Sequence, residues 1–187
     1  MSAGDEMDAI ISGSGASGGL GVAGGSGGIP QGFDAENAQN DEGIEMQFAV
    51  MCMEQAEVYF GLITKIKPSE LKRLTKWDDE IVEAFLKAFP EYDDADKLRL
   101  LSEDEIKSPG GKRRWREFMM PFADKIDEYN FGTLIRLDCT QDYTQANSMF
   151  GYRLQFYALE ILRNRKGLND AVWQRVQDDP DAFAESK

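Results

Sequence analysis

The sequence contains no histidine among its 187 residues and only two cysteines, Cys52 and Cys139. Without histidine, the chain can form neither a Ser-His-Asp or Cys-His catalytic arrangement nor a histidine-liganded metal centre. Two isolated cysteines are also too few for a structural zinc site or a disulfide framework. Such sparse cysteine favours a reducing compartment, so we expect a cytoplasmic or nuclear protein without a metal or other cofactor.

Long apolar runs and an excess of positive charge are lacking as well. No apolar run approaches the roughly 18 residues that cross a bilayer, so the sequence does not predict an integral membrane protein. The 21 basic residues are outnumbered by 34 acidic ones, which gives a formal net charge of -13. This balance argues against a broad surface for phosphate backbones, and we therefore do not expect binding to DNA.

Residues 1–43 contain no Lys or Arg, although they hold seven acidic residues and 12 of the 18 glycines. So few apolar side chains cannot offset the conformational entropy that ordering would cost. Residues 13–18 match the G-x-G-x-x-G spacing of a dinucleotide-binding turn, but a glycine-rich tract produces that match by chance. We expect a disordered acidic tail over residues 1–43, one domain over residues 44–177 and a frayed tail over residues 178–187.

The domain itself carries mainly helical periodicity, with apolar residues at spacings of three, four and seven. The helices predicted in this way, with their caps and terminating prolines, span residues 44–66, 75–89, 102–107, 112–129, 145–166 and 169–176. The apolar positions that make the first of them amphipathic are Phe48, Met51, Val58, Tyr59, Leu62 and Ile63.

A short apolar run at residues 133–138 favours a strand, and residues 98–101 are its expected partner. Residues 108–111 read as a loop because they contain Pro and two Gly residues. The predicted fold class is mainly α: a compact domain of five to six helices, to which the sequence allows a small two-stranded β ribbon to be added.

Three polar residues interrupt the most apolar helix, at spacings of seven and four: Arg153, Glu160 and Asn164. These spacings place them on one face of the helix. One interpretation is an ion pair at the edge of the core, and the other is a polar anchor in a binding groove. The sequence leaves both open.

Two further features have a functional and a structural interpretation. A basic cluster at residues 112–116 includes Arg113 and Arg114 near a predicted helix N-terminus, where cations are disfavoured. It suits an acidic partner or RNA, or else a solvated turn with Trp115 folded inward. Cys139 follows the predicted strand and is a candidate reactive thiol, although it lacks an evident basic neighbour.

Several unusual strings, in a fixed order, resemble the polysaccharide biosynthesis domain-containing protein 1 family. The strings are NFGTLIRLDC at 130–139, YT at 143–144, RLQFYALEI at 153–161, RNR at 163–165 and Gly167, preceded by EQAEVY at 54–59, LTK at 74–76, DD at 78–79 and WR at 115–116. The resemblance covers about residues 44–176 and leaves the glycine-rich segment outside.

The resemblance implies a small cytosolic chaperone dedicated to translation elongation factor 1-alpha, rather than the carbohydrate chemistry in the family's name. Members of the family are thought to bind the GTP-binding domain of that factor during or just after synthesis, without using ATP. The resemblance carries no catalytic residue. We accordingly expect a non-enzymatic, monomeric protein-binding protein that takes part in protein folding and elongation factor biogenesis.

Three regions are candidate partner-binding surfaces from exposed polarity and from the resemblance. Their residues are Asn130, Thr133, Arg136 and Asp138; Arg153, Glu160 and Asn164; and Arg113 and Arg114. Elongation factor 1-alpha is basic, so an acidic partner would be steered towards it. The alternative function is a ribosome- or RNA-associated adaptor without catalytic activity, with the ribosome or nascent-chain factors as its partners.

Overall fold

A computed structural model describes residues 42–184 of the chain, and the side chains of residues 45–184. The proposed dinucleotide turn at 13–18, nearly all of the acidic segment and the last three residues lie outside this range. The described chain contains seven α-helices and one two-stranded antiparallel sheet, so the predicted mainly α fold with a small ribbon is confirmed. No helix within residues 42–184 has the length and hydropathy that a membrane span requires.

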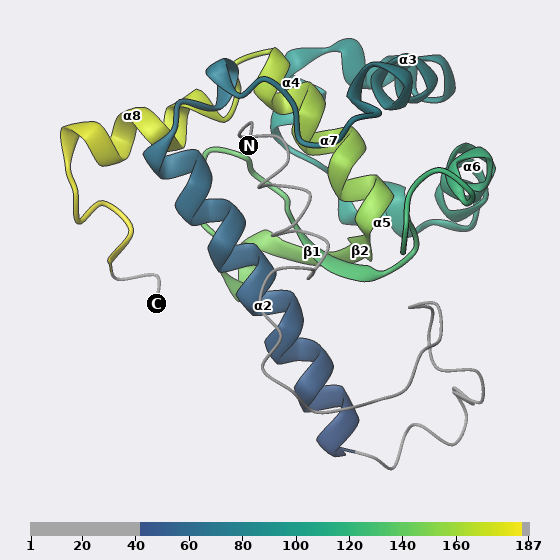
Figure 1. Cartoon of the computed structure of the whole chain (residues 1–187), viewed down its shortest axis with the longest axis horizontal. Coiled ribbons are helices and arrows are strands. Elements are labelled where there is room, and N and C mark those ends of the chain that lie inside the picture. Colours follow the sequence, from purple (N-terminus) through teal and green to yellow (C-terminus); the bar gives the residue numbers. More distant parts are fainter. Residues whose placement is uncertain (1–41, 185–187) are drawn as a thin grey trace.

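The first helix, α2 (Glu42–Lys65), runs along one side of the molecule, and its first turns extend beyond the sheet (Figure 1). It packs against β1 (Gly132–Arg136) and against α8 (Asp170–Asp178). Tyr59 and Ile63 are buried there. Helix α2 ends shortly before Pro68, as predicted, because this proline opens the 3-10 turn η2 (Pro68–Glu70).

Four short helices lie on the other side. They are α3 (Asp78–Ala88), α4 (Ala95–Arg99), α5 (Glu103–Lys107) and α6 (Pro109–Met119), with the 3-10 turn η3 (Pro90–Asp93) between α3 and α4. Two of them, α3 and α6, supply rings of an aromatic cluster together with this 3-10 turn. The ring of Phe85 lies 5.4 Å from that of Tyr92 and 5.5 Å from that of Trp115, centroid to centroid. Trp115 is therefore folded inward, and this cluster fixes α3 against α6.

Helix α6 begins and ends earlier than the sequence predicted. The Ser108 hydroxyl accepts a hydrogen bond from the Gly111 amide at 2.9 Å, so it caps a helix that starts at Pro109 inside the expected loop. At the other end, Pro121 lacks an amide proton and cannot continue the helix. The chain passes through η4 (Met120–Phe122) into turns, and Glu128 adopts a positive φ of 54°.

The strand over 133–138 was correctly predicted, but its main partner was not. β1 pairs antiparallel with β2 (Ser148–Tyr152), in a register that sets Leu134 opposite Phe150. Residues 98–101 contribute only an isolated bridge, Leu100 opposite Asp138. Residues 148–152 had been assigned to the helix 145–166, because alternating and helical apolar patterns cannot be told apart over so few residues.

Helix α7 (Arg153–Arg165) consequently begins eight residues later than predicted, after η5 (Gln145–Asn147) and β2. The side-chain oxygen of Gln155 accepts a hydrogen bond from the Tyr152 amide at 2.8 Å and so marks its start. Helix α7 contacts α3, α4, α6 and both strands, and every residue from Arg153 to Asn164 is buried. It is the central element of the fold.

Glycine ends α7 as the sequence predicted. Gly167 has a positive φ of 69°, the left-handed conformation that favours glycine after a helix. Helix α8 follows, and beyond it Phe183 packs edge-on against Phe60 at 5.2 Å between ring centroids. At least this part of the segment expected to be frayed contacts the domain.

The capping role of Ser108 gives a direct test of where α6 begins. Ser108→Ala removes the acceptor for the Gly111 amide and should lower the free energy of unfolding by about 1 kcal/mol. Ser108→Asp keeps an acceptor at the cap and should retain most of the stability. Urea unfolding followed by circular dichroism measures both, and equal stability of all three proteins would contradict the assigned start.

Candidate functional site

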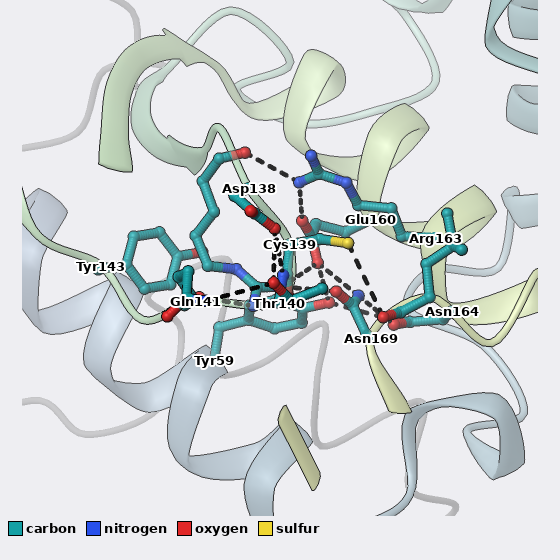
Figure 2. Close-up of polar contacts among 12 residues, drawn as sticks. Tyr59, Asp138, Cys139, Thr140, Gln141, Tyr143, Glu160, Arg163, Asn164 and Asn169 are labelled. Atoms are coloured by element: carbon teal, nitrogen blue, oxygen red, sulfur yellow. Dashed lines mark hydrogen bonds and ion pairs between the residues drawn. The ribbon is translucent and has the colours of Figure 1, made fainter. Parts of the chain in front are cut away.

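A cluster of polar side chains lies inside the protein, between α2, α7 and the sheet, and is drawn in Figure 2. We call it the buried polar network, and it consists of Tyr59, Arg136, Glu160, Arg163, Asn164 and Asn169. Glu160 is 0% exposed and lies at its centre. Both of its carboxylate oxygens are bound, one by Arg136 Nη2 at 3.0 Å and the other by Arg163 Nη1 at 2.8 Å.

Neutral donors complete the environment of Glu160. The Tyr59 hydroxyl donates to Oε2 at 2.7 Å, and the Asn169 amide nitrogen donates to the same oxygen at 2.8 Å. Asn164 joins the network by donating to the Tyr59 hydroxyl at 3.3 Å. A buried carboxylate is tolerated when it is paired and hydrogen-bonded in this way.

The two guanidinium groups also bind backbone carbonyls of loops that approach α7. Arg163 donates to the carbonyl oxygens of Leu98 at 3.0 Å and of Leu137 at 3.0 Å. Arg136 donates to the carbonyl oxygen of Cys139 at 2.8 Å. The network therefore joins α4, the end of β1 and the loop after it to the central helix, and we assign it to the stability of the fold.

The charge state of Glu160 follows from these contacts. Burial by itself raises the pKa of this carboxyl, but the nearby charges of Arg136 and Arg163 and the hydrogen bonds of Arg163 and Tyr59 outweigh it and lower the pKa to about 2. Glu160 is therefore ionised at neutral pH. Two cations surround one anion, and the groups available for acid–base chemistry are all engaged with one another.

Arg153 belongs to a separate ion pair at the beginning of α7. Its Nη1 atom lies 2.7 Å from a carboxylate oxygen of Glu128, and its guanidinium lies 5.1 Å from the centroid of the Phe131 ring. The side chain is buried. This pair ties the start of α7 to the turn before β1.

These contacts correct the interpretation of the polar face of α7. Arg153, Glu160 and Asn164 lie on one helix, but all three are buried, so they do not line an exposed groove in this structure. Nor do Arg153 and Glu160 pair with each other, since their partners are Glu128 and the two arginines of the network. The helical spacing was right, whereas the burial of the whole helix could not be seen from it.

The other candidate partner-binding residues occupy mixed environments. Asn130 is exposed, whereas Thr133 and Arg136 of β1 are buried. Asp138 lies in the turn after β1, where one carboxylate oxygen accepts hydrogen bonds from the amide and the hydroxyl of Thr140. Most of this segment is thus part of the domain interior, and Asn130 is its exposed end.

The two candidate arginines of α6 are both exposed, but only Arg114 forms an ion pair that the structure describes. Arg114 forms a two-pronged ion pair with Glu91, at 2.7 and 3.1 Å, and its guanidinium stacks 4.4 Å from the centroid of the Phe89 ring. The Arg114 side chain therefore connects α6 with η3, and Arg114 has a structural role that the sequence did not indicate.

Neither cysteine is placed for reactivity. Cys139 is fully buried, and burial raises the pKa of its thiol, which disfavours the thiolate. Cys52 is also buried, as expected for a core residue. Among residues 42–184, no group of three or more Cys, Asp or Glu side chains is arranged to hold a metal ion.

The most unusual surface of the molecule was not predicted from the sequence, and it lies on α2 between residues 46 and 58. We call it the α2 ridge, and its exposed apolar side chains are Met46, Val50, Met51, Met53 and Val58. Met46 is 69% exposed and Met53 is 57% exposed. Met51 and Val58, which were predicted to help form the apolar face of this helix, point outward instead. The signal was present in the sequence, because apolar residues surround this helix on all sides.

The fold and the site define a small, mainly α protein whose polar centre is internal and whose exposed surface carries an apolar helix. A family model described as "PBDC1 protein" matches residues 44–174. The chain belongs to this family, as the resemblance in its sequence implied.

Its relatives include curated proteins and a solved structure. The chain is 52% identical to "Protein PBDC1 homolog" of Saccharomyces cerevisiae over 140 residues, which cover 75% of this chain and 95% of that protein. It is 45% identical to "Protein PBDC1" of Homo sapiens over 144 residues, 77% of this chain and 60% of that protein. A solution NMR structure of a Saccharomyces cerevisiae protein, 50% identical, matches with a TM-score of 0.67 over 77% of this chain and 98% of that one.

The structural role assigned to Glu160 can be tested by removing its charge. Glu160→Gln leaves the two arginines without their buried counter-charge and should lower the free energy of unfolding by about 3–5 kcal/mol. Glu117→Gln is a matched control because Glu117 is exposed on α6, and it should change stability by less than about 0.5 kcal/mol. Equal effects of the two substitutions in urea unfolding would contradict the role of the network.

The lowered pKa of Glu160 predicts how this contribution depends on pH. An ordinary glutamate in the unfolded chain titrates near 4.3, so the folded state is favoured above that pH. The contribution should be lost as the pH falls from there towards about 2. The stability difference between the natural protein and Glu160→Gln should therefore shrink on acidification, and a difference that stays constant between about pH 6 and pH 3 would contradict the assignment.

Proposed function

We propose that this protein is an ATP-independent cytoplasmic chaperone that binds the GTP-binding domain of translation elongation factor 1-alpha during or just after its synthesis. The proposal rests on membership of the PBDC1 family and on what the sequence resemblance implies for that family. The single structural observation that carries it is the exposed apolar surface on α2.

An exposed apolar surface of this kind is what a binder of incompletely folded protein requires. Clusters of exposed apolar side chains on a protein surface commonly mark sites of interaction. Three of the five α2 ridge residues are methionines, whose flexible side chains adapt to partners of varied shape. The surface thus suits a client whose own apolar groups are temporarily unburied.

Charge supports the same proposal. The chain carries a formal net charge of -13, and elongation factor 1-alpha is basic. Opposite net charges accelerate the encounter between two proteins and favour the correct partner over acidic ones. Binding of this type uses no catalytic group, and the polar residues that would be the obvious candidates are engaged in the buried polar network.

A second candidate function is a ribosome- or RNA-associated adaptor. The observation that favours it is the exposed basic surface of α6, formed by Lys112, Arg113 and Arg116. Within the described chain, no ion pair engages these three side chains. RNA binding through them would weaken steeply as the salt concentration rises.

The proposed function is tested by measuring the affinity of the full chain for the isolated GTP-binding domain of elongation factor 1-alpha. We expect tight binding to the nucleotide-free domain and binding at least tenfold weaker once GTP has been added, because GTP stabilises the folded client. Isothermal titration calorimetry provides both affinities.

Two results would count against this function. One is the absence of binding in either nucleotide state when both proteins are folded and monodisperse. The other is binding to ribosomal RNA that disappears in Arg113→Glu/Arg116→Glu while the client is not bound, which would favour the adaptor. The client affinity of that double variant should otherwise remain close to that of the natural protein.

A further inference from the structure

We propose that the α2 ridge is the docking surface for an amphipathic helix that carries Lys or Arg beside its apolar face. This inference rests on the proposed function and deepens it, because it names the part of the molecule that receives the client and the chemistry of the client segment. It is argued from four features of the described residues.

The first feature is the division of α2 into two faces. Phe48, Cys52 and Tyr59 point inward: Phe48 lies over the sheet, the Cys52 thiol donates to the Gly132 carbonyl at 3.4 Å, and Tyr59 joins the buried polar network. Met46, Val50 and Met53 follow at spacings of four and three on the outward face, and all are about half exposed or more. An apolar stripe with this spacing is the contact surface that one helix offers to another.

The second feature is the extent of the surface. From Met46 to Met53 the outward stripe rises by about 10 Å, roughly two turns, which matches two turns of a partner helix. In Figure 1 no other helix or strand covers the first turns of α2.

The third feature is the apolar character of α2 on all sides. A helix that is apolar all round is normally enclosed by other elements. The inward face of α2 packs against β1 and α8, whereas the α2 ridge stays open among residues 45–184. A partner that covers the α2 ridge would enclose this side of the helix as well.

The fourth feature is charge, and it selects the occupant. Glu45, Glu54 and Glu57 are exposed on α2, and its first basic residue is Lys65 in the last turn. Cations that flank an apolar helix would therefore be attracted to this surface. The segment before α2 has six acidic residues and no basic one. A second copy of the chain presents the same glutamates, and an anionic lipid surface is also negative. All three are disfavoured relative to a basic helix.

The test substitutes the outward face with glutamine, which keeps helix propensity. The triple variant Met46→Gln/Val50→Gln/Met53→Gln should lose at least tenfold in affinity for the nucleotide-free GTP-binding domain. The matched control Leu100→Gln/Met120→Gln alters two other highly exposed apolar side chains and should stay within twofold of the natural protein. Circular dichroism and the melting temperature identify a variant that fails to fold, and in that case the single substitution Met46→Gln should show a smaller loss of the same sign.

A model peptide separates the inference from the proposed function. An amphipathic peptide of Leu and Lys should bind the natural protein and lose that binding in the triple variant, whereas a peptide of Leu and Glu should bind at least tenfold more weakly. One outcome is that the protein does not bind the client but does bind the Leu–Lys peptide, and that the triple variant loses the peptide binding. In that case the proposed function is wrong and the docking surface stands. If the client is bound equally by the triple variant, the docking surface is wrong and the proposed function stands.

Other occupants would overturn the inference in recognisable ways. Peptide binding that increases tenfold in Ile10→Asp/Ile11→Asp would mean that the N-terminal segment of the same chain occupies the α2 ridge. A dimer in analytical ultracentrifugation that the triple variant converts to a monomer would mean that a second copy does. Equal affinity for the Lys and Glu peptides would remove the argument from charge.

Discussion

The structure depends on the ionised carboxylate of Glu160, held between two buried guanidinium groups. Each arginine binds one oxygen and also donates to a backbone carbonyl: Arg136 to that of Cys139 in the loop after β1, and Arg163 to that of Leu98 in α4, 65 positions away. An isolated buried charge would be strongly unfavourable, so these partners must assemble together or not at all. The interaction therefore fixes how α2, α4 and β1 sit against α7, which purely apolar packing would specify less sharply.

The sequence was a good guide wherever a local signal decides the structure. Proline and glycine mark the ends of α2, α3 and α7, and Gly167 takes the positive φ expected of it. Local signals failed at residues 148–152, where a pairing with β1 overrides a helical apolar pattern. Ser108 was read as part of a loop because the glycines after it conceal a capped helix start.

The candidate residues illustrate a different limit. The polar residues of α7 were correctly grouped by helical spacing, but their partners come from elsewhere: Arg136 lies 24 positions from Glu160, and Tyr59 lies 101 positions away. No periodicity within one helix reveals such partners, so the choice between a buried ion pair and an exposed groove could not be made from sequence. Similarly, Met46 and Met53 face outward because the opposite side of α2 packs against β1, a contact between segments far apart in the sequence.

Burial of charge in the centre and exposure of apolar residues on α2 are connected through Tyr59. Its hydroxyl binds Glu160, so the second half of α2 is anchored to the centre of the fold. Helix formation propagates more easily than it begins, and this anchor therefore supports the first turns, where the outward side chains of Met46 and Val50 stay exposed. The α2 ridge can remain helical while it stays open to a partner. Covering these exposed side chains would stabilise the first turns further, so binding and local order on α2 are coupled.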